Sequence, residues 1–179
     1  MYSFSGPSGS GKSTIIKAIL DRTPDASLSA SCTTRQMRSG EIDGQDYYFL
    51  SHNQFEQYIK DGSFIEYTRC YGNYYGTLKT EIIKRLDTSK YCIIDLDYVG
   101  AKNVIEHQGS DYQATGVLIL PPSITSLAKR LQKRMSETDD SLNLRVQQSF
   151  NASAITKYEL IIINRDINEA ISKCISLFE

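Results

Sequence analysis

Short apolar runs alternate along the chain with longer segments in which apolar residues recur every three or four positions. The short runs predict β-strands, at residues 2–5, 28–34, 64–70, 91–97, 115–120 and 160–164. The longer segments predict helices, at residues 13–21, 51–62, 77–86, 101–107, 124–134, 142–158 and 168–178. Strands that alternate with helices favour a parallel sheet covered by helices on both faces. The pattern therefore predicts one α/β domain.

Local signals mark where several of these elements begin and end. The run Ser51-His52-Asn53-Gln54 fits a capping box, in which a serine and a glutamine satisfy each other's exposed amides at a helix start. The pair Pro121-Pro122 breaks the chain after a strand, and Gly72-Asn73 predicts a turn. The polar stretch 36–46 predicts a loop.

The composition agrees with a folded domain. The chain has 179 residues, of which 40% are hydrophobic and 23% charged, as in ordinary globular proteins. Its longest apolar run, near residues 161–163, is far shorter than a membrane helix requires, and no signal-peptide pattern follows Met1. The 20 basic and 21 acidic residues give a net charge of −1, which argues against a sequence-independent nucleic-acid binder. We therefore expect a cytoplasmic protein with no membrane or nucleic-acid partner.

The four cysteines, Cys32, Cys70, Cys92 and Cys174, are far apart in the sequence. No Cys-x-x-Cys pair is present, and the chain has only 2 histidines to complete a metal site, so structural zinc is not expected. In the cytoplasm these cysteines are reduced thiols. We expect Cys32, Cys92 and Cys174 to be small buried hydrophobic residues.

The most specific motif is the loop Gly6-Pro7-Ser8-Gly9-Ser10-Gly11-Lys12-Ser13, which fits the P-loop pattern G-x-x-x-x-G-K-S/T. It follows a predicted strand and opens a predicted helix. Glycines allow the backbone amides to surround a phosphate, and the helix amino terminus adds a positive dipole end. Lys12 is expected to reach the β- and γ-phosphates of a nucleotide, and the Ser13 hydroxyl to bind Mg²⁺. The alternative is a glycine- and serine-rich turn with an incidental lysine.

Further motifs resemble those of the guanylate kinase family. They occur in the family's order and cover essentially the whole chain: Ser31-Cys32-Thr33-Thr34-Arg35-Gln36-Met37-Arg38, Gly40-Glu41-Ile42-Asp43-Gly44-Gln45-Asp46-Tyr47, Phe64-Ile65-Glu66, Gly72-Asn73-Tyr74-Tyr75-Gly76-Thr77, Ile94-Asp95-Leu96-Asp97, Pro121-Pro122-Ser123, Arg130-Leu131 and Asn164. The resemblance implies a three-layer P-loop NTPase fold with a parallel central sheet. It also implies Mg²⁺-dependent transfer of the γ-phosphoryl group of ATP to GMP, giving ADP and GDP in purine nucleotide metabolism.

The same resemblance divides the single domain into three regions. The core is expected at residues 1–30, 78–128 and 147–179, the small GMP-binding region at 31–77 and a mobile lid at 129–146. It further implies that dGMP is an acceptor. The sequence does not reveal the oligomeric state, so the protein is expected to be a monomer or a homodimer.

Two arginines three residues apart, Arg35 and Arg38, lie among hydroxyl-bearing residues. Guanidinium groups suit bidentate contacts with phosphate better than lysine does. The resemblance implies that both arginines bind the GMP phosphate together with the hydroxyls of Tyr47 and Tyr75. The alternative is a solvated loop with two ordinary arginines.

Glu66 is the candidate reader of the base. Guanine presents two donors, N1–H and the exocyclic amine, that one carboxylate can accept, whereas adenine presents an acceptor at N1 and would leave the carboxylate unpaired. Ser31 and Thr77 resemble the family's supporting contacts to the base, although Thr77 also lies where a helix N-cap is expected. Asp97 is assigned to the GMP side, and Asp95 is expected to pair with an arginine.

The resemblance assigns catalysis to Lys12, Arg38, Arg134 and Arg145. Arginines that neutralise charge between donor and acceptor carry much of phosphoryl transfer. The resemblance assigns ATP binding to the P-loop residues with Thr14, Arg130 and Asn164. Arg130 and Arg134 share one helix face, and a solvent-exposed basic helix is the alternative.

The sequence departs from the family's usual residues at Met37, Val99, Met135-Ser136 and Arg165. These differences leave turnover rate and donor preference open. Two other functions remain as alternatives: a related P-loop kinase acting on another phosphorylated acceptor such as a ribosyl bisphosphate, and a catalytically weak interaction module that binds phosphopeptides. Glu66 argues against the first, because a sugar phosphate has no guanine edge, and the intact P-loop argues against the second.

Overall fold

The computed structural model describes residues 1–70, 72–106, 113–132 and 158–179. A five-stranded sheet forms its centre, in the order β2-β7-β1-β8-β9. All neighbouring strands in this sheet are parallel, which confirms the predicted parallel central sheet. The strands are β1 (Tyr2–Ser5), β2 (Ala26–Leu28), β7 (Tyr91–Asp95), β8 (Thr115–Leu120) and β9 (Leu160–Ile163).

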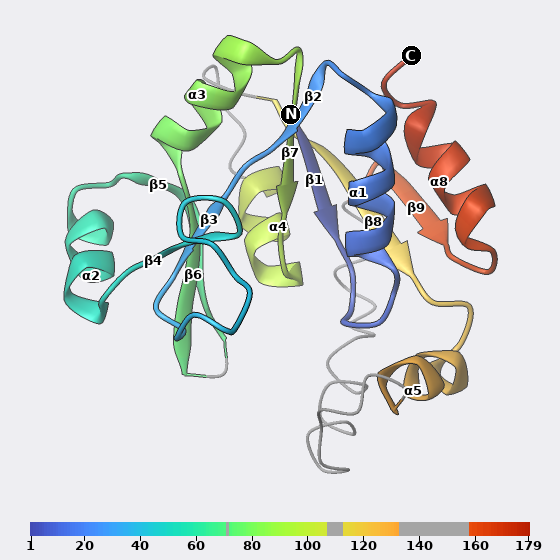
Figure 1. The fold of residues 1–179 in the computed structure, drawn as a ribbon, viewed down its shortest axis with the longest axis horizontal. Coiled ribbons are helices and arrows are strands. Elements are labelled where there is room, and N and C mark those ends of the chain that lie inside the picture. The colour runs from blue at the N-terminus through green and yellow to red at the C-terminus, as the bar shows by residue number, and fades with distance from the viewer. Residues whose placement is uncertain (71, 107–112, 133–157) are drawn as a thin grey trace.

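Helices cover both faces of this sheet, as Figure 1 shows. The covering helices are α1 (Lys12–Arg22), α3 (Lys79–Thr88), α4 (Tyr98–Glu106) and α8 (Ile167–Ile175), and α5 (Ile124–Gln132) follows β8 beyond the end of the strands. One core cluster joins Phe4 and Ile93 of the sheet to Ile15 of α1 and Ile171 of α8. A second cluster joins the central strands to α3 and α4, with Ile94 among its buried residues. Since Ile93 and Ile94 belong to different clusters, β7 is buried on both faces, as its apolar run predicts.

A second, smaller sheet lies beside the central one (Figure 1), in the order β4-β3-β6-β5. It is built from β3 (Ser31–Thr33), β4 (Tyr47–Phe49), β5 (Phe64–Cys70) and β6 (Asn73–Leu78). Helix α2 (His52–Lys60) packs on this sheet through the fully buried Phe55, which stacks on Phe64 with 4.4 Å between ring centroids. The small sheet therefore has its own apolar cluster.

The structure corrects several predicted boundaries. The run 28–34, predicted as one strand, is divided between β2 of the central sheet and β3 of the small sheet. The three-residue strand β4 and the strand β6 were not predicted. Thr77 lies in β6, so the predicted helix start there is wrong: α3 begins at Lys79. Helix α4 begins at Tyr98, three residues before its predicted start.

Other predictions are confirmed or untested. The capping box of α2 is present, with Ser51 N donating to Gln54 Oε1 at 2.9 Å and Gln54 N donating to Ser51 Oγ at 3.3 Å. Cys32, Cys92 and Cys174 are buried and free, and burial raises the pKa of the Cys32 thiol to about 12. The predicted helix 142–158 and the predicted lid beyond residue 132 lie outside the described residues. No helix among the described residues has the length and apolar character to cross a membrane.

Candidate active site

The glycine-rich loop connects β1 to α1, as predicted. Gly6 and Gly11 have φ angles of 152° and 98°, a region that favours glycine. A Cβ at Gly6 would lie 2.2 Å from the Ile119 carbonyl oxygen, and one at Gly11 would lie 2.3 Å from Asn164 Nδ2, so both positions also lack room for a side chain. Gly11 precedes α1 without a side-chain cap. The first amides of α1 therefore lack this capping partner, an arrangement suited to phosphate.

Lys12 lies at the end of this loop, where its ammonium group contacts the carboxyl end of β7. Its Nζ donates to Asp95 Oδ1 and, at 3.3 Å, to the Leu96 carbonyl oxygen. Burial lowers the pKa of Lys12 to about 8, and the nearby charge of Asp97 opposes this shift. Among the described residues the cation beside Asp95 is therefore Lys12, and the predicted arginine partner stays a prediction.

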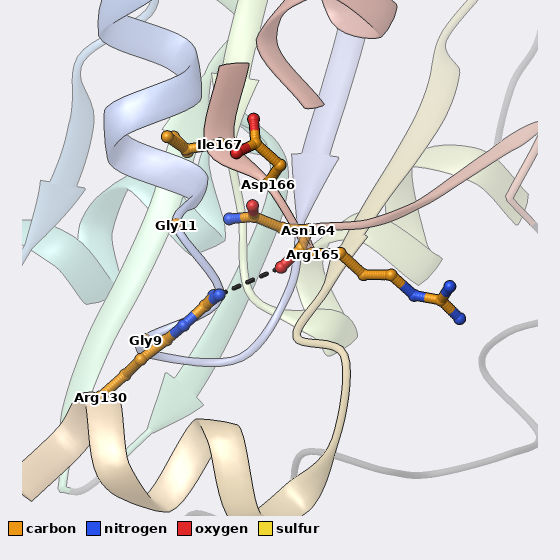
Figure 2. A pocket seen from close by; sticks show the side chains of 7 residues that line it. All are labelled: Gly9, Gly11, Arg130, Asn164, Arg165, Asp166 and Ile167. Carbon is orange, nitrogen blue, oxygen red and sulfur yellow. Dashed lines mark hydrogen bonds between the residues drawn. The ribbon is translucent and has the colours of Figure 1, made fainter. Parts of the chain in front are cut away.

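A pocket of about 490 Å³ opens beside the loop. Figure 2 shows its lining residues: Gly9, Gly11, Arg130, Asn164, Arg165, Asp166 and Ile167. Arg130 Nη2 donates to the Asn164 carbonyl oxygen at 3.1 Å, and Asn164 Nδ2 donates to the Ser10 carbonyl oxygen at 2.7 Å. The structure thus brings Arg130 and Asn164 to the P-loop from segments far apart in the sequence.

Two residues that depart from the family pattern are described by the structure: Arg165 lines this pocket, and Met37 is exposed. In Figure 2 the Arg165 guanidinium extends away from Arg130. Its neighbour Asp166 caps α8 by accepting hydrogen bonds from Asn168 N at 2.8 Å and Glu169 N at 3.1 Å. Met37 is 55% exposed in the loop that carries Arg35 and Arg38 (the arginine loop, residues 34–46), so it packs little against its surroundings.

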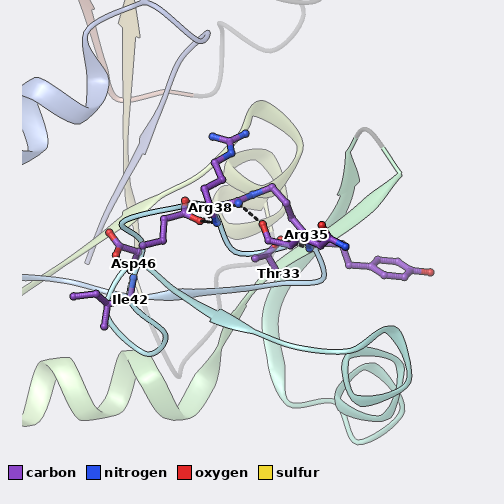
Figure 3. Close-up of polar contacts among 8 residues, drawn as sticks. Thr33, Arg35, Arg38, Ile42 and Asp46 are labelled. Atoms are coloured by element: carbon purple, nitrogen blue, oxygen red, sulfur yellow. Dashed lines mark hydrogen bonds and ion pairs between the residues drawn. The ribbon is translucent and has the colours of Figure 1, made fainter. Parts of the chain in front are cut away.

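The predicted phosphate-binding residues of the small sheet gather around one arginine. The Arg35 guanidinium lies 5.3 Å from the centre of the Tyr47 ring, and the Tyr47 and Tyr75 rings are 6.3 Å apart. Arg38 is exposed, and Figure 3 shows its side chain extending away from the loop. Ser31 begins β3, in register with Tyr47. Three of the four predicted phosphate ligands, Arg35, Tyr47 and Tyr75, are therefore neighbours.

Glu41 organises the arginine loop and was missed by the sequence analysis. It accepts from Arg35 Nη2 at 2.8 Å and Nη1 at 3.0 Å, and from the Arg38 backbone amide at 2.7 Å. The hydrogen bonds from Arg35 hold the pKa of Glu41 below its usual range. Its only signal in the sequence is a carboxylate six residues after Arg35, and spacing does not predict contacts within a loop.

Glu66 is buried between the small sheet and α4, with 6% of its surface exposed. The Thr77 hydroxyl donates to Glu66 Oε1 at 2.9 Å. Burial raises the pKa of Glu66 to about 7; the bond from Thr77 opposes the shift and the charge of Asp97 adds to it. Thr77 therefore supports Glu66, and it is not the N-cap of α3.

Asp97 lies close to both Lys12 of the P-loop and Glu66 of the small sheet. Its Oδ2 accepts from the Thr68 hydroxyl at 3.1 Å and its Oδ1 from the Gly100 amide at 2.7 Å. Its charge acts on both Lys12 and Glu66. The contacts from Thr68 and Gly100 were not predicted, since they join distant strands and a helix start. Arg134 and Arg145 lie outside the described residues, and Thr14 lies in the first turn of α1.

Comparison with known proteins gives a consistent result across the chain. The family model described as "Guanylate kinase" matches residues 1–179. A guanylate kinase of Clostridium perfringens (strain SM101 / Type A) is 41% identical over 170 residues, which cover 94% of this chain and 77% of that protein. A guanylate kinase of Clostridium tetani is 40% identical over 174 residues, covering 97% and 82% of the two chains. The crystal structure of guanylate kinase from Anaplasma phagocytophilum has a TM-score of 0.73 and 25% identity, covering 99% and 82%.

Proposed function

The chain belongs to the guanylate kinase family and is an ATP:GMP phosphotransferase, and from this premise we propose which of its residues carry the reaction. The observation that carries the proposal is the buried carboxylate of Glu66, held by Thr77 at 2.9 Å. An ionised carboxylate accepts from two parallel N–H donors, and guanine supplies both. Adenine has an acceptor at N1 and leaves the carboxylate unpaired in a buried place.

The phosphate of GMP is proposed to bind Arg35, Arg38, Tyr47 and Tyr75. Both terminal nitrogens of Arg35 are paired with Glu41. A phosphate is a second anionic partner for the same guanidinium, which the exposed Arg38 joins from the loop. Ser31 is proposed to support the base together with Thr77, and Asp97 to face the GMP side of the site.

The donor ATP is proposed to occupy the pocket beside the P-loop. Its phosphates lie on the loop amides, Lys12 and Thr14, and its base lies near Arg130 and Asn164. Support comes from the two hydrogen bonds that tie Arg130 and Asn164 to Ser10 and to each other. Lys12 leaves Asp95 for the β- and γ-phosphates, where its charge stabilises the transferring group.

Mg²⁺ is proposed as the cofactor. The exposed hydroxyl of Ser13 and the carboxylate of Asp95 line one pocket of about 260 Å³, and oxygen atoms of these kinds are the ligands that Mg²⁺ prefers. These residues therefore fit the metal, with Ser13 as a direct ligand beside waters and phosphates. The ion supplies positive charge that neutralises the phosphate oxygens.

We further propose that dGMP serves as a second acceptor. The protein is proposed to act in purine nucleotide metabolism in the cytoplasm, as a monomer or homodimer. Cys32, Cys92 and Cys174 are buried thiols outside any disulfide among the described residues, as in proteins of a reducing compartment.

The KM for GMP is expected to rise as the pH falls through 7. Because the pKa of Glu66 is raised to about 7, the free enzyme carries a growing fraction of the protonated acid at lower pH. Guanine donates two hydrogen bonds, and only the ionised form accepts both, so the rise between pH 8 and pH 6 is about tenfold. Steady-state kinetics at saturating ATP measure it.

The phosphate of GMP also has a pKa of about 6 and contributes to this profile. The variant Glu66→Gln carries no titrating group at that position and shows the contribution of the phosphate alone. Identical pH profiles for wild type and variant would remove Glu66 from the base site.

Arg134→Ala is expected to lower kcat about 100-fold or more while raising the KM for GMP only a few-fold. By the family's pattern Arg134 binds the transferring group, so its loss removes stabilisation of the transition state rather than of bound GMP. The control is Lys129→Ala, an exposed basic residue of α5. An unchanged kcat in Arg134→Ala would contradict a catalytic role for Arg134.

A further inference from the structure

Gly100 lies in the first turn of α4 and is buried against Glu66. A Cβ built at this position would lie 2.6 Å from Glu66 Oε2 and 3.3 Å from Glu66 Cδ. Gly100 is not among the glycines with positive φ, so its backbone does not require glycine. Alanine is the better helix former, and helix propensity does not favour glycine here either. The remaining reason for a glycine at position 100 is that the Glu66 carboxylate occupies the space that a side chain would need.

The Glu66 carboxylate is held from two sides. Its Oε1 accepts the Thr77 hydroxyl of β6 at 2.9 Å, and its Oε2 faces Gly100 of α4. The small sheet thus supplies one wall and the central domain the other. The same turn of α4 holds Asp97, through the Gly100 amide at 2.7 Å from Asp97 Oδ1.

A methyl group at Gly100 cannot share this space with the carboxylate. Carbon and oxygen atoms in ordinary contact are about 3.5 Å apart, so the carboxylate would have to move by about 1 Å. Glu66 is only 6% exposed, and moving it weakens its bond to Thr77. A displacement of about 1 Å at a recognition group costs up to about 100-fold in rate or affinity.

We propose that Gly100 is a positioning residue for base recognition: by lacking a side chain, it lets the start of α4 set where the Glu66 carboxylate meets guanine. The inference rests on the proposed role of Glu66 as the reader of the base. A Cβ at Gly100 would clash with Glu66 alone, since it lies 3.4 Å from Asp97 Oδ1, an ordinary contact, and the Gly100 amide can keep its bond to Asp97. Substitution of Gly100 should therefore affect the acceptor base and leave phosphoryl transfer from bound substrates largely intact.

Gly100→Ala is expected to raise the KM for GMP about 10- to 100-fold, with kcat at saturating GMP and the KM for ATP within about threefold of wild type. The preference for GMP over AMP falls by a similar factor. The control is Val99→Ala, a neighbour on the same helix that is 56% exposed. A purely structural defect would instead lower the active fraction, and with it kcat, at unchanged KM. That result, or a KM within twofold of wild type, overturns the inference.

A double-mutant cycle with Glu66→Asp tests whether Gly100 acts through Glu66. Aspartate is one methylene shorter, so its carboxylate is already withdrawn from Gly100. We expect Gly100→Ala to raise the KM for GMP at least about threefold less in the Glu66→Asp background than in wild type. Equal effects in both backgrounds would contradict action through Glu66.

The two levels of the proposal fail in different ways. If Glu66→Gln leaves the KM for GMP and the discrimination against AMP unchanged, the role of Glu66 fails. If Glu66→Gln changes both and Gly100→Ala changes neither, only the inference on Gly100 fails. If Gly100→Ala alone does not fold, the double variant Gly100→Ala/Glu66→Asp decides, because the shorter aspartate removes the clash. A double variant that folds supports the inference, and one that does not fold contradicts it.

Discussion

Lys12→Ala is expected to lower kcat by about 10³-fold or more while GMP still binds. Phosphoryl transfer involves little covalent chemistry for the protein, so the positive charge at the transferring group accounts for much of the rate. The structure places the Lys12 ammonium at the carboxyl end of β7, in contact with Asp95 and the Leu96 carbonyl oxygen. These contacts are at the central sheet, whereas the Glu66–Thr77 pair belongs to the small sheet.

A coupled assay of ADP release measures kcat, and calorimetry measures GMP binding. The matched control is Lys17→Ala on the same helix, since the Lys17 side chain is 76% exposed and pairs with Asp21. This control should keep kcat within about threefold of wild type. If calorimetry shows that Lys12→Ala loses GMP binding as completely as turnover, the assignment of the P-loop to the phosphates of ATP is wrong.

Glu66→Gln is expected to lower kcat/KM for GMP by about 10²- to 10³-fold and to remove most of the preference for GMP over AMP. The amide keeps the shape of the side chain but replaces one acceptor oxygen with an NH₂ donor. That donor faces a donor of guanine, so one hydrogen bond is lost and a polar clash replaces it inside a buried site. The Thr77 hydroxyl, which donates to Oε1 at 2.9 Å, can still bond the remaining oxygen.

Steady-state kinetics with GMP and with AMP, at saturating ATP, give both effects. Glu56→Gln on α2 is the control, because Glu56 is an exposed glutamate of the same small-sheet region. A variant at Glu66 that keeps its preference for GMP would mean that other residues read the base.

The elements around the P-loop could be predicted from the sequence because their signals are local. The strand β1 has its predicted bounds, the glycine pattern identifies the loop, and the periodic apolar residues of α1 identify the helix that follows. The capping box of α2 is likewise a contact between residues three positions apart. Such features need no knowledge of the rest of the fold.

The small sheet could not be predicted in the same way. Strand β4 has three residues, and it is held by pairing with β3, which lies more than ten residues earlier in the chain. Strand β6 carries glycine and polar residues and is fixed between β3 and β5. Local propensity is weak in such short strands, and the pairing with distant strands decides their conformation.

Contacts within the site also depend on residues that are distant in the sequence, and most of them could not be predicted. The resemblance to the family identified Arg35, Glu66 and Asp97, which lie in or beside the small sheet. It did not identify the pairing of Arg35 with Glu41 at 2.8 Å or the contact between Gly100 and Glu66. These depend on how a loop folds and on how closely a helix approaches a strand.

The most direct test of the account is ADP release with ATP, Mg²⁺ and each of GMP, dGMP, AMP, CMP and UMP as acceptor. The buried Glu66 carboxylate predicts that GMP and dGMP are phosphorylated and that kcat/KM for AMP is lower by about 10³-fold or more. The pyrimidine nucleotides are expected to be poor acceptors as well. Equal kcat/KM for AMP and GMP would contradict the reading of guanine by Glu66.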